Sequence, residues 1–276
     1  METGFDLKNK GDIPFLQIPA FNKTGLVKHG FSTRQGGVSP EPFYSMNLAG
    51  HVGDSLENMR ENRRLFSSVL GLSPEHWVTA QQVHGTAVRV VSACDAGRGA
   101  LDYDGALADT DALITSEPEV PLATFYADCV PVFFLDPVTP AIGIAHAGWK
   151  GTVGKIPAIT LREMAKQFGT KAEDCLVGIG PSIGPCCYEV DKFVADQVVQ
   201  AFGQDDYLLR PIGPGKWLLD LWQANRQELL RAGVQEQNIT VAGLCTCCNP
   251  ELLFSYRAES GVTGRMGGLI ALSRRS

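Results

Sequence analysis

The sequence predicts a mixed α+β fold in a single domain, and three observations lead to this prediction. The chain has 276 residues, of which 44% are hydrophobic, enough to form a substantial core. Strand-like and helix-like stretches alternate without forming regular strand–helix–strand units, and there is no G-x-G-x-x-G or Walker loop. No linker, repeat or low-complexity tract divides the chain, so we expect one domain over residues 1–276.

The strands and helices are predicted from apolar runs of strand length and from apolar periodicity that ends at glycine. The clearest helix covers residues 54–70, where Asp54 and Glu57 have the spacing of a capping box and Gly71 follows the last turn. The other predicted helices cover residues 152–168, 191–202 and 221–232. The predicted strands cover residues 25–33, 112–115, 130–135, 141–145, 175–180, 216–219, 239–242 and 267–272, with two short runs within 77–91.

Charge and hydropathy exclude several classes of partner. Lys and Arg number 24 against 30 Asp and Glu, giving a net charge of −6, so nothing attracts nucleic acid or an anionic membrane. No apolar run reaches the ~18 residues that span a bilayer, and the polar opening METGFDLKNKGD lacks the apolar core of a secretory signal. We therefore expect a soluble, cytoplasmic protein with reduced thiols and no obligate protein partner.

A predicted hairpin brings two reactive side chains together. The apolar runs 130–135 and 141–145 flank a proline-rich turn, with Cys129 directly before the first run and His146 directly after the second. In an antiparallel pair, both residues fall at the open end of the hairpin. A thiolate beside an imidazole indicates either a metal site or a nucleophile with its base.

Two other groups of polar residues have simpler interpretations. Cysteines occur in two further places, and we interpret both as lacking C-x-x-C spacing and a nearby histidine. We therefore expect ordinary thiols rather than a second metal cluster at Cys186, Cys187, Cys245, Cys247 and Cys248. Residues 94–111 are glycine-rich and acidic but lack a calcium-loop pattern. We expect a solvated loop there that includes Asp102, Asp104, Asp109 and Asp111.

Six motifs, taken in combination, resemble the YfiH-like laccase-domain family over nearly the whole chain from about Gly25 onward. They are His29-Gly30-Phe31-Ser32-Thr33-Arg34, Gln82-Val83-His84-Gly85, Ala127-Asp128-Cys129-Val130-Pro131, His146-Ala147-Gly148-Trp149-Lys150-Gly151, Cys187-Tyr188-Glu189-Val190 and Phe254-Ser255-Tyr256-Arg257. Members of that family are regarded as purine nucleoside phosphorylases with adenosine deaminase activity and were formerly labelled polyphenol oxidoreductases.

The resemblance implies two packed β-sheets flanked by helices and a single zinc ion held by His84, Cys129 and His146. Copper is conceivable as a substitute for zinc. One departure is Lys150, which stands where the family commonly has arginine and lacks the bidentate fork of a guanidinium. Three protein ligands leave a fourth position open, which is the pattern of catalytic zinc rather than of a closed structural site.

The implied reactions assign roles to further residues. The substrates would be adenosine, inosine or 5′-methylthioadenosine together with phosphate, and in deamination Asp128 is the nearest carboxylate in sequence to move protons. Arg34 enters a Gly-Gly turn at the end of a predicted strand, and we expect it to bind phosphate with Asn47 and Arg63. The remaining candidates for substrate binding are Tyr188, Glu189 and Arg257.

Three other functions compete with this one. A laccase-like polyphenol oxidoreductase needs a set of copper ions held mainly by imidazoles, for which five histidines are too few. A cysteine hydrolase would use Cys129 as nucleophile and His146 as base, without any need for His84. A non-catalytic zinc protein, such as a cell-wall editing factor, is the third alternative.

Overall fold

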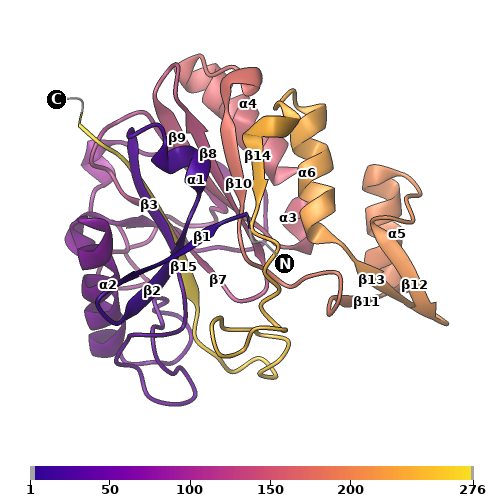
Figure 1. Cartoon of the computed structure of the whole chain (residues 1–276), viewed down its shortest axis with the longest axis horizontal. Coiled ribbons are helices and arrows are strands. Elements are labelled where there is room, and N and C mark those ends of the chain that lie inside the picture. Colours follow the sequence, from indigo (N-terminus) through magenta and orange to yellow (C-terminus); the bar gives the residue numbers. More distant parts are fainter. Residues whose placement is uncertain (1–3, 275–276) are drawn as a thin grey trace.

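The computed structural model describes residues 4–274, and its centre consists of two packed β-sheets (Figure 1). One six-stranded sheet has the spatial order β1 (Asp6–Lys10), β2 (Ile13–Gln17), β3 (Val27–Ser32), β15 (Met266–Leu272), β7 (Leu122–Tyr126) and β4 (Val78–Thr79). The other has the order β14 (Ile239–Val241), β10 (Leu176–Ile179), β8 (Val130–Asp136), β9 (Ala141–Ala147), β6 (Ala112–Thr115) and β5 (Val88–Val90). Both sheets are mixed, because β4–β7, β5–β6 and β10–β14 are parallel pairs among antiparallel ones.

The inner faces of the two sheets share one apolar cluster, in which Phe31 and Ile270 of the first sheet meet Phe133 of the second. Gly268 of β15 shows how closely the sheets approach. A Cβ atom at Gly268 would lie 2.9 Å from both the Phe133 ring and the Ile144 side chain. Only a residue without a side chain fits at this point of contact.

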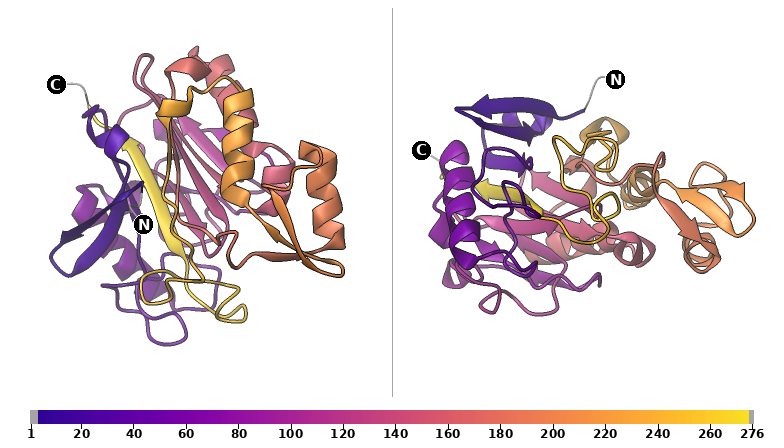
Figure 2. Two further views of the ribbon diagram at one scale, coloured as in Figure 1. Left: turned by 45° about the vertical axis from the view of Figure 1, so that its right-hand side comes forward. Right: turned by 90° about the horizontal axis from the view of Figure 1, so that it is seen from below.

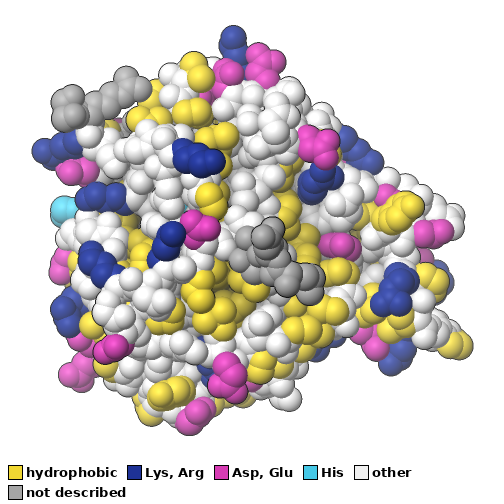
Figure 3. Space-filling view, viewed as in Figure 1, with side chains coloured by type: hydrophobic (Ala, Val, Ile, Leu, Met, Phe, Trp, Pro, Cys, Tyr) yellow, Lys and Arg dark blue, Asp and Glu magenta, His cyan; other side chains and the backbone are white. Residues whose placement is uncertain are grey.

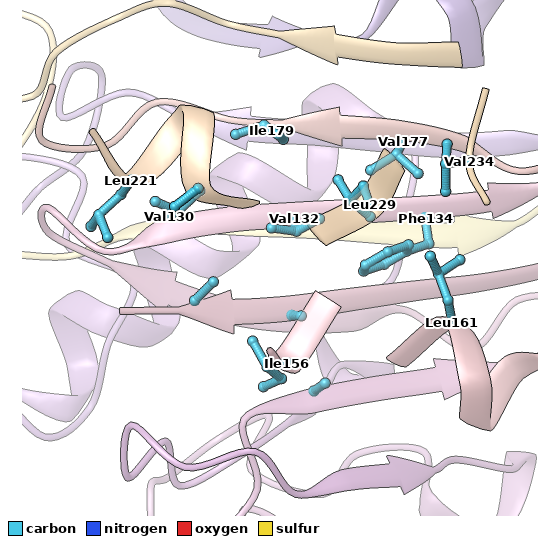
Figure 4. Packing of buried hydrophobic residues seen from close by; sticks show 14 of the residues in the cluster. Val130, Val132, Phe134, Ile156, Leu161, Val177, Ile179, Leu221, Leu229 and Val234 are labelled. Atoms are coloured by element: carbon cyan, nitrogen blue, oxygen red, sulfur yellow. The ribbon is translucent and has the colours of Figure 1, made fainter. Parts of the chain in front are cut away.

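Helices cover both outer faces. α2 (Leu56–Leu70) packs on the first sheet through Phe66 and Leu70. On the second sheet, α4 (Ile156–Phe168) and α6 (Leu221–Arg231) bury Leu161 and Leu229 against Phe134 and its neighbours (Figure 4). The remaining helices are the short α1 (Pro19–Asn22) and α3 (Trp149–Val153), and α5 (Lys192–Phe202).

A small third sheet extends the molecule on the side of α6. It consists of β11 (Glu189–Asp191), β13 (Lys216–Leu219) and β12 (Leu209–Gly213), and α5 lies on it. Figure 2 shows this sheet and α5 projecting beside α6. On the face seen in Figure 3, Lys and Arg side chains are interspersed with Asp and Glu rather than gathered in one patch. Within the described part of the chain, no helix combines the length and apolar character needed to cross a bilayer.

The predicted α+β class, with two packed mixed sheets flanked by helices, is confirmed. The single domain over residues 1–276 stays a prediction, and residues 1–3 and 275–276 of it lie outside the described part. The predicted helix over 152–168 is wrong at its start. The chain instead forms α3 and α4, because Lys155 between them has a left-handed backbone with φ 64° and Pro157 belongs to the first turn of α4.

The start of α2 also differs from the prediction. Ser55, not Asp54, is the N-cap, and its side chain accepts a hydrogen bond from the Asn58 backbone N–H at 3.1 Å. Asp54 precedes the N-cap, and its side chain accepts a hydrogen bond from the Ser55 backbone N–H. The predicted end is confirmed, because Gly71 has a left-handed conformation with φ 65°. Strands β1, β2, β7, β11 and β12 were not predicted.

Candidate metal centre and cavity

The β8–β9 hairpin forms as predicted and brings Cys129 close to His146. In the antiparallel register, Val130 pairs with Ala147 and Pro131 pairs with His146. Cys129 directly precedes β8, so both side chains lie at the open end of the hairpin, away from its turn. Asp136 holds the turn. The proline that follows it has no N–H, and Asp136 Oδ1 accepts hydrogen bonds from the backbone N–H groups of the two residues after that proline.

His84 reaches the same place from the loop between β4 and β5. Its backbone is left-handed, with φ 60°, and its ring meets the His146 ring edge-on with the centroids 4.8 Å apart. One ligand atom from each of His84, Cys129 and His146 lies within 4.8 Å of the other two. Two imidazoles and one thiol at this separation can hold a metal ion.

Asp111 holds this arrangement together, and our expectation of a solvated residue is wrong. Its side chain is fully buried and accepts from His146 Nδ1 at 2.9 Å, which leaves Nε2 of that ring as the ligand atom. The same carboxylate accepts from the backbone N–H groups of His84 at 3.0 Å and Gly85 at 2.7 Å. One carboxylate therefore fixes the loop that carries the first histidine and the ring of the second.

Gly148 gives the ligands room. A Cβ atom at this position would lie 2.9 Å from Cδ2 of His84 and 3.0 Å from Sγ of Cys129. The backbone of Gly148, with φ −64° and ψ 175°, is one that any residue adopts. The glycine is needed for the close approach of the side chains and not for backbone freedom.

The electrostatics of the site favour a charged pair of residues. Burial by itself would raise the pKa of Cys129, but the neighbouring imidazoles of His146 and His84 bring it down to about 6. Burial likewise opposes protonation of His146, but the Cys129 thiolate and Asp111 raise its pKa to about 9. Without a metal, these opposite shifts favour a thiolate at Cys129 beside an imidazolium at His146.

These three residues line a cavity of about 510 Å³, within the range of small-molecule sites. Its other walls are aromatic, cationic and polar, and they are formed by His51, Gln82, Phe125, Ala127, Asp128, Trp149, Ile183, Tyr188, Tyr256, Arg257 and Arg265. A smaller cavity of about 230 Å³ shares His84, Asp128 and Cys129 with it and adds Lys150. The cavity can therefore offer ring faces and positive charge beside the metal ligands.

Asp128 lines the cavity and also anchors one of its walls. Its Oδ1 accepts from Thr246 Oγ1 at 2.6 Å and from Ser255 Oγ at 2.7 Å, and its Oδ2 accepts from the Arg257 backbone N–H at 2.6 Å. Asp128 thereby ties the strand end before Cys129 to residues 246–257. Its role in moving protons stays a prediction.

Arg34 does not reach this cavity. Its Nε donates to the Tyr44 carbonyl at 3.0 Å, one terminal nitrogen donates to the Pro250 carbonyl at 2.8 Å, and the other pairs with Glu259 at 3.0 Å. The guanidinium also lies over the Phe254 ring. Through these contacts, Arg34 joins the 34–45 segment to the 250–259 segment.

Asn47 and Arg63 are likewise placed inside the fold. Asn47 is fully buried and donates to Asp54 Oδ2 at 3.0 Å, while its own Oδ1 accepts from the Arg265 backbone N–H. Arg63 is 2% exposed and donates to the carbonyls of Leu48, Gly99 and Ala100. The structure thus brings none of the three expected phosphate ligands to the metal site.

Tyr188 and Arg257 do line the cavity, with the guanidinium carbon of Arg257 5.4 Å from the centre of the Tyr188 ring. Glu189 lies beside them but pairs with Lys216 at 2.7 Å, and its carbonyl accepts from Arg257. The sequence analysis missed Arg265, a cavity cation that no motif marks. Its position directly before β15 was the available signal.

Comparisons with known proteins find relatives over most of the chain. Residues 28–273 match the family model described as multi-copper polyphenol oxidoreductase laccase. The protein named purine nucleoside phosphorylase YlmD from Geobacillus stearothermophilus is 42% identical over 238 residues, which cover 86% of this chain and 87% of that protein. The protein of the same name from Bacillus subtilis is 40% identical over 243 residues, covering 88% and 87%.

Two solved structures share the whole fold. The crystal structure of YlmD from Geobacillus stearothermophilus superimposes with a TM-score of 0.93 at 37% identity, covering 99% of this chain and 100% of that one. The crystal structure of the Bacillus licheniformis hypothetical protein YfiH gives 0.92 at 39% identity, covering 97% and 99%. Since the family model spans most of the chain and these relatives align nearly end to end, the chain belongs to the YfiH-like laccase-domain family.

Proposed function

We propose that this protein is a zinc-dependent purine nucleoside phosphorylase that also deaminates adenosine. Its substrates are adenosine, inosine and 5′-methylthioadenosine, which react with phosphate to give the free base and the ribose 1-phosphate. The observation that carries the proposal is the His84, Cys129 and His146 donor set in the wall of a cavity that also presents aromatic rings and arginines. The names of the relatives support the phosphorylase activity.

The donor set fits zinc. Two imidazoles and one thiolate are ligands that zinc accepts, and three protein ligands leave one position for an oxygen atom. Asp111 orients His146 as a carboxylate does in histidine–zinc sites. A bound zinc ion would supply a Lewis acid that polarises that oxygen.

The cavity supplies binding surfaces for both substrates. The purine has aromatic faces available from Phe125, Tyr188 and Tyr256, which can stack on a planar base. Phosphate needs cationic donors, and in our proposal Arg257 and Arg265 take the place of Arg34, Asn47 and Arg63. In phosphorolysis a phosphate oxygen attacks C1′ of the ribose while the purine leaves, so both groups must be held in line.

Deamination uses the same purine position with water in place of phosphate. Water adds at C6 of adenine and ammonia leaves, which requires a group that accepts and returns a proton. A carboxylate has about four acceptor sites, and Asp128 uses three of them for Thr246, Ser255 and Arg257. We assign the proton transfer to the remaining acceptor site of the Asp128 carboxylate.

A cysteine hydrolase is the second candidate, because the metal-free pair has a Cys129 pKa of about 6 beside a protonated His146. Zinc and nucleophile functions exclude each other at one sulfur atom. Metal removal should therefore abolish nucleoside turnover and expose Cys129 to alkylation. A hydrolase would instead gain activity when the metal is removed.

The decisive experiment uses purified protein of known metal content. It is incubated with adenosine, inosine and 5′-methylthioadenosine, each with and without phosphate, and the products are identified. Phosphate-dependent release of free base supports phosphorolysis, and formation of inosine from adenosine supports deamination. Release of neither product by zinc-loaded protein would overturn the proposal.

A further inference from the structure

Four cysteines from two distant parts of the sequence gather at one place outside the catalytic cavity. Cys186 and Cys187 lie in the turn after β10, and Cys245 and Cys248 lie in the turn after β14. One sulfur from each of the four lies within 4.8 Å of the other three. The Cys248 sulfur is 3.5 Å from that of Cys186 and 3.3 Å from that of Cys187.

The backbone places these two turns side by side. Ser182 and Cys245 form a parallel β-bridge, Ser182 N–H donates to the Leu244 carbonyl at 3.2 Å, and Thr246 N–H donates to the Ser182 carbonyl at 3.0 Å. Asn249 closes the second turn by donating from its side chain to the Cys245 carbonyl at 2.7 Å. The cluster therefore rests on main-chain pairing and does not depend on flexible side chains alone.

We propose that Cys186, Cys187, Cys245 and Cys248 form a second, structural zinc site. Zn–S bonds of about 2.3 Å in a tetrahedron put neighbouring sulfurs about 3.8 Å apart. Two of the sulfur–sulfur separations are 3.3 Å and 3.5 Å, slightly shorter than that spacing, and none of the six exceeds 4.8 Å. Four thiolates fill every position of a tetrahedral ion, so this site has no open position for a substrate.

The surroundings suit a metal thiolate. The Gly184 backbone N–H donates to Cys245 Sγ at 3.2 Å, a contact that stabilises negative charge on sulfur. A Cβ atom at Gly184 would lie 2.8 Å from the Trp222 ring and 3.3 Å from Cys186 Sγ, so glycine lets this N–H reach the cluster. An all-sulfur donor set selects zinc over the hard cations magnesium and calcium.

A pair of disulfides fits the geometry less well. Disulfides join sulfurs in separate pairs about 2.05 Å apart, whereas Cys248 contacts both Cys186 and Cys187 at similar distances. A tetrahedral ion needs all four sulfurs close to one another, and here every sulfur lies within 4.8 Å of the other three. Cys245 and Cys248 also have the C-x-x-C spacing common at zinc sites, so our interpretation that neither cysteine group has this spacing is wrong.

The cluster lies between two turns that form or support the wall of the catalytic cavity. The first turn carries Ile183 and Tyr188 into the wall of the catalytic cavity. The second turn leads to Thr246 and Ser255, whose hydroxyls hold Asp128. A zinc ion joining the two turns would hold that wall in place from outside, so these cysteines are positioning residues for the active site.

Metal stoichiometry tests the proposal whether or not the nucleoside activity is correct. The full-length protein is purified without chelator, dialysed against metal-free buffer, and its zinc measured by mass spectrometry. The wild type should hold about two zinc ions per chain. Cys186→Ser, Cys248→Ser and His84→Ala should each hold about one, and Cys248→Ser combined with His84→Ala about none.

Matched controls come from cysteines outside the cluster. Cys247→Ser changes the residue beside Cys248, Cys94→Ser changes an exposed thiol elsewhere, and both variants should keep two zinc ions. Cys186→Ser should also lower turnover by about 10- to 100-fold through displacement of the cavity wall, while its remaining zinc stays bound. One zinc per chain in the wild type, unchanged in the cluster variants, would overturn the proposal.

A thiol count covers the case in which the serine variants do not fold. Wild-type protein is denatured with chelator and without reductant, and reactive thiols are counted. A zinc site leaves all eight cysteines reactive. Stepwise titration of the native protein with a mercurial should release the cluster zinc and the catalytic zinc as two separate ions. Six reactive thiols or fewer would indicate a disulfide and contradict the zinc site.

Discussion

The carboxylate of Asp111 and the ring of His146 lie 2.9 Å apart, and this contact determines which nitrogen of the histidine faces the cavity. Asp111→Asn keeps the size of the side chain but removes its charge and presents an amide to the backbone N–H groups of His84 and Gly85. We expect the His84, Cys129 and His146 site to bind the proposed zinc ion about 10- to 100-fold more weakly, the usual effect of losing a carboxylate partner of a metal-bound histidine. Competition with a chelator of known affinity measures the change.

Asp109→Asn is the matched control, because Asp109 lies two residues away in the same loop and is exposed. It should keep wild-type affinity for the metal. Equal affinities in the two variants would show that the buried contact of Asp111 does not support the metal centre.

Gly148→Ala adds one methyl group where there is no room for it. Its Cβ would lie 2.9 Å from the His84 ring and 3.0 Å from Cys129 Sγ, so at least one ligand must move. We expect the variant to lose zinc from the catalytic site while keeping most of its stability, since its backbone angles suit alanine. Zinc analysis together with thermal unfolding separates the two effects.

Gly213→Ala controls for the added methyl group, because a Cβ there has no neighbour within 4 Å and the backbone is not left-handed. That variant should retain its metal and its melting temperature. Retention of catalytic zinc by Gly148→Ala would mean that the loop of His84 adapts at little cost.

The sequence predicted the parts of the site that depend on local structure. The β8–β9 hairpin follows from two apolar runs and a proline-rich turn, and it places Cys129 beside His146 without any knowledge of the rest of the chain. His84 comes from a different loop, and only the family resemblance joined it to the other two. Asp111 was assigned to solvent because its neighbours are polar, yet its burial depends on backbone N–H groups that arrive from residues 83–85.

Tertiary contacts also explain why the expected arginines are elsewhere. Arg34 does follow a strand and enter a glycine turn, but Glu259 and the Pro250 carbonyl lie close to it only in the folded chain. Arg63 was expected to bind phosphate, but its three carbonyl partners come from loops outside α2. A pattern of neighbouring residues in the sequence cannot predict hydrogen-bond partners that come from distant segments.

Arg265→Lys tests the phosphate contact. Lysine keeps the positive charge but loses the planar fork of Arg265, so a bidentate contact should weaken by roughly 1.5–3 kcal/mol. This corresponds to a rise of about 10- to 100-fold in the KM for phosphate. Deamination of adenosine, which consumes water instead, should change much less. Steady-state kinetics of both reactions on one preparation provide the comparison.

Arg34→Lys is the comparison variant, because its guanidinium already joins Glu259 to two carbonyls. We expect it to lower the free energy of unfolding by roughly 1–2 kcal/mol and to leave the KM for phosphate unchanged. If Arg34→Lys raises the KM for phosphate and Arg265→Lys does not, the phosphate contact must be assigned to Arg34 and not to Arg265.

His29 makes stability depend on pH. The ring is 1% exposed, its Nε2 accepts from the Ile18 backbone N–H at 2.8 Å, and among the described residues its Nδ1 has no partner. Burial lowers its pKa from 6.5 to about 4. Between these values the unfolded chain binds a proton that the folded chain does not, so the free energy of unfolding falls as pH drops from 6.5 toward 4. The loss from this group is roughly 3 kcal/mol.

Urea unfolding at several pH values between 7 and 4 measures this contribution as a difference between proteins. His29→Gln should be less stable than the wild type at pH 7, but it should lose less stability as the pH falls, because glutamine does not titrate. His76→Gln, at an exposed histidine, should follow the wild-type curve. His51, which is exposed, is present in all three proteins, so its contribution cancels in the comparison. Parallel curves for the wild type and His29→Gln would show that His29 takes up its proton equally in both states and that its burial does not set the acid limit.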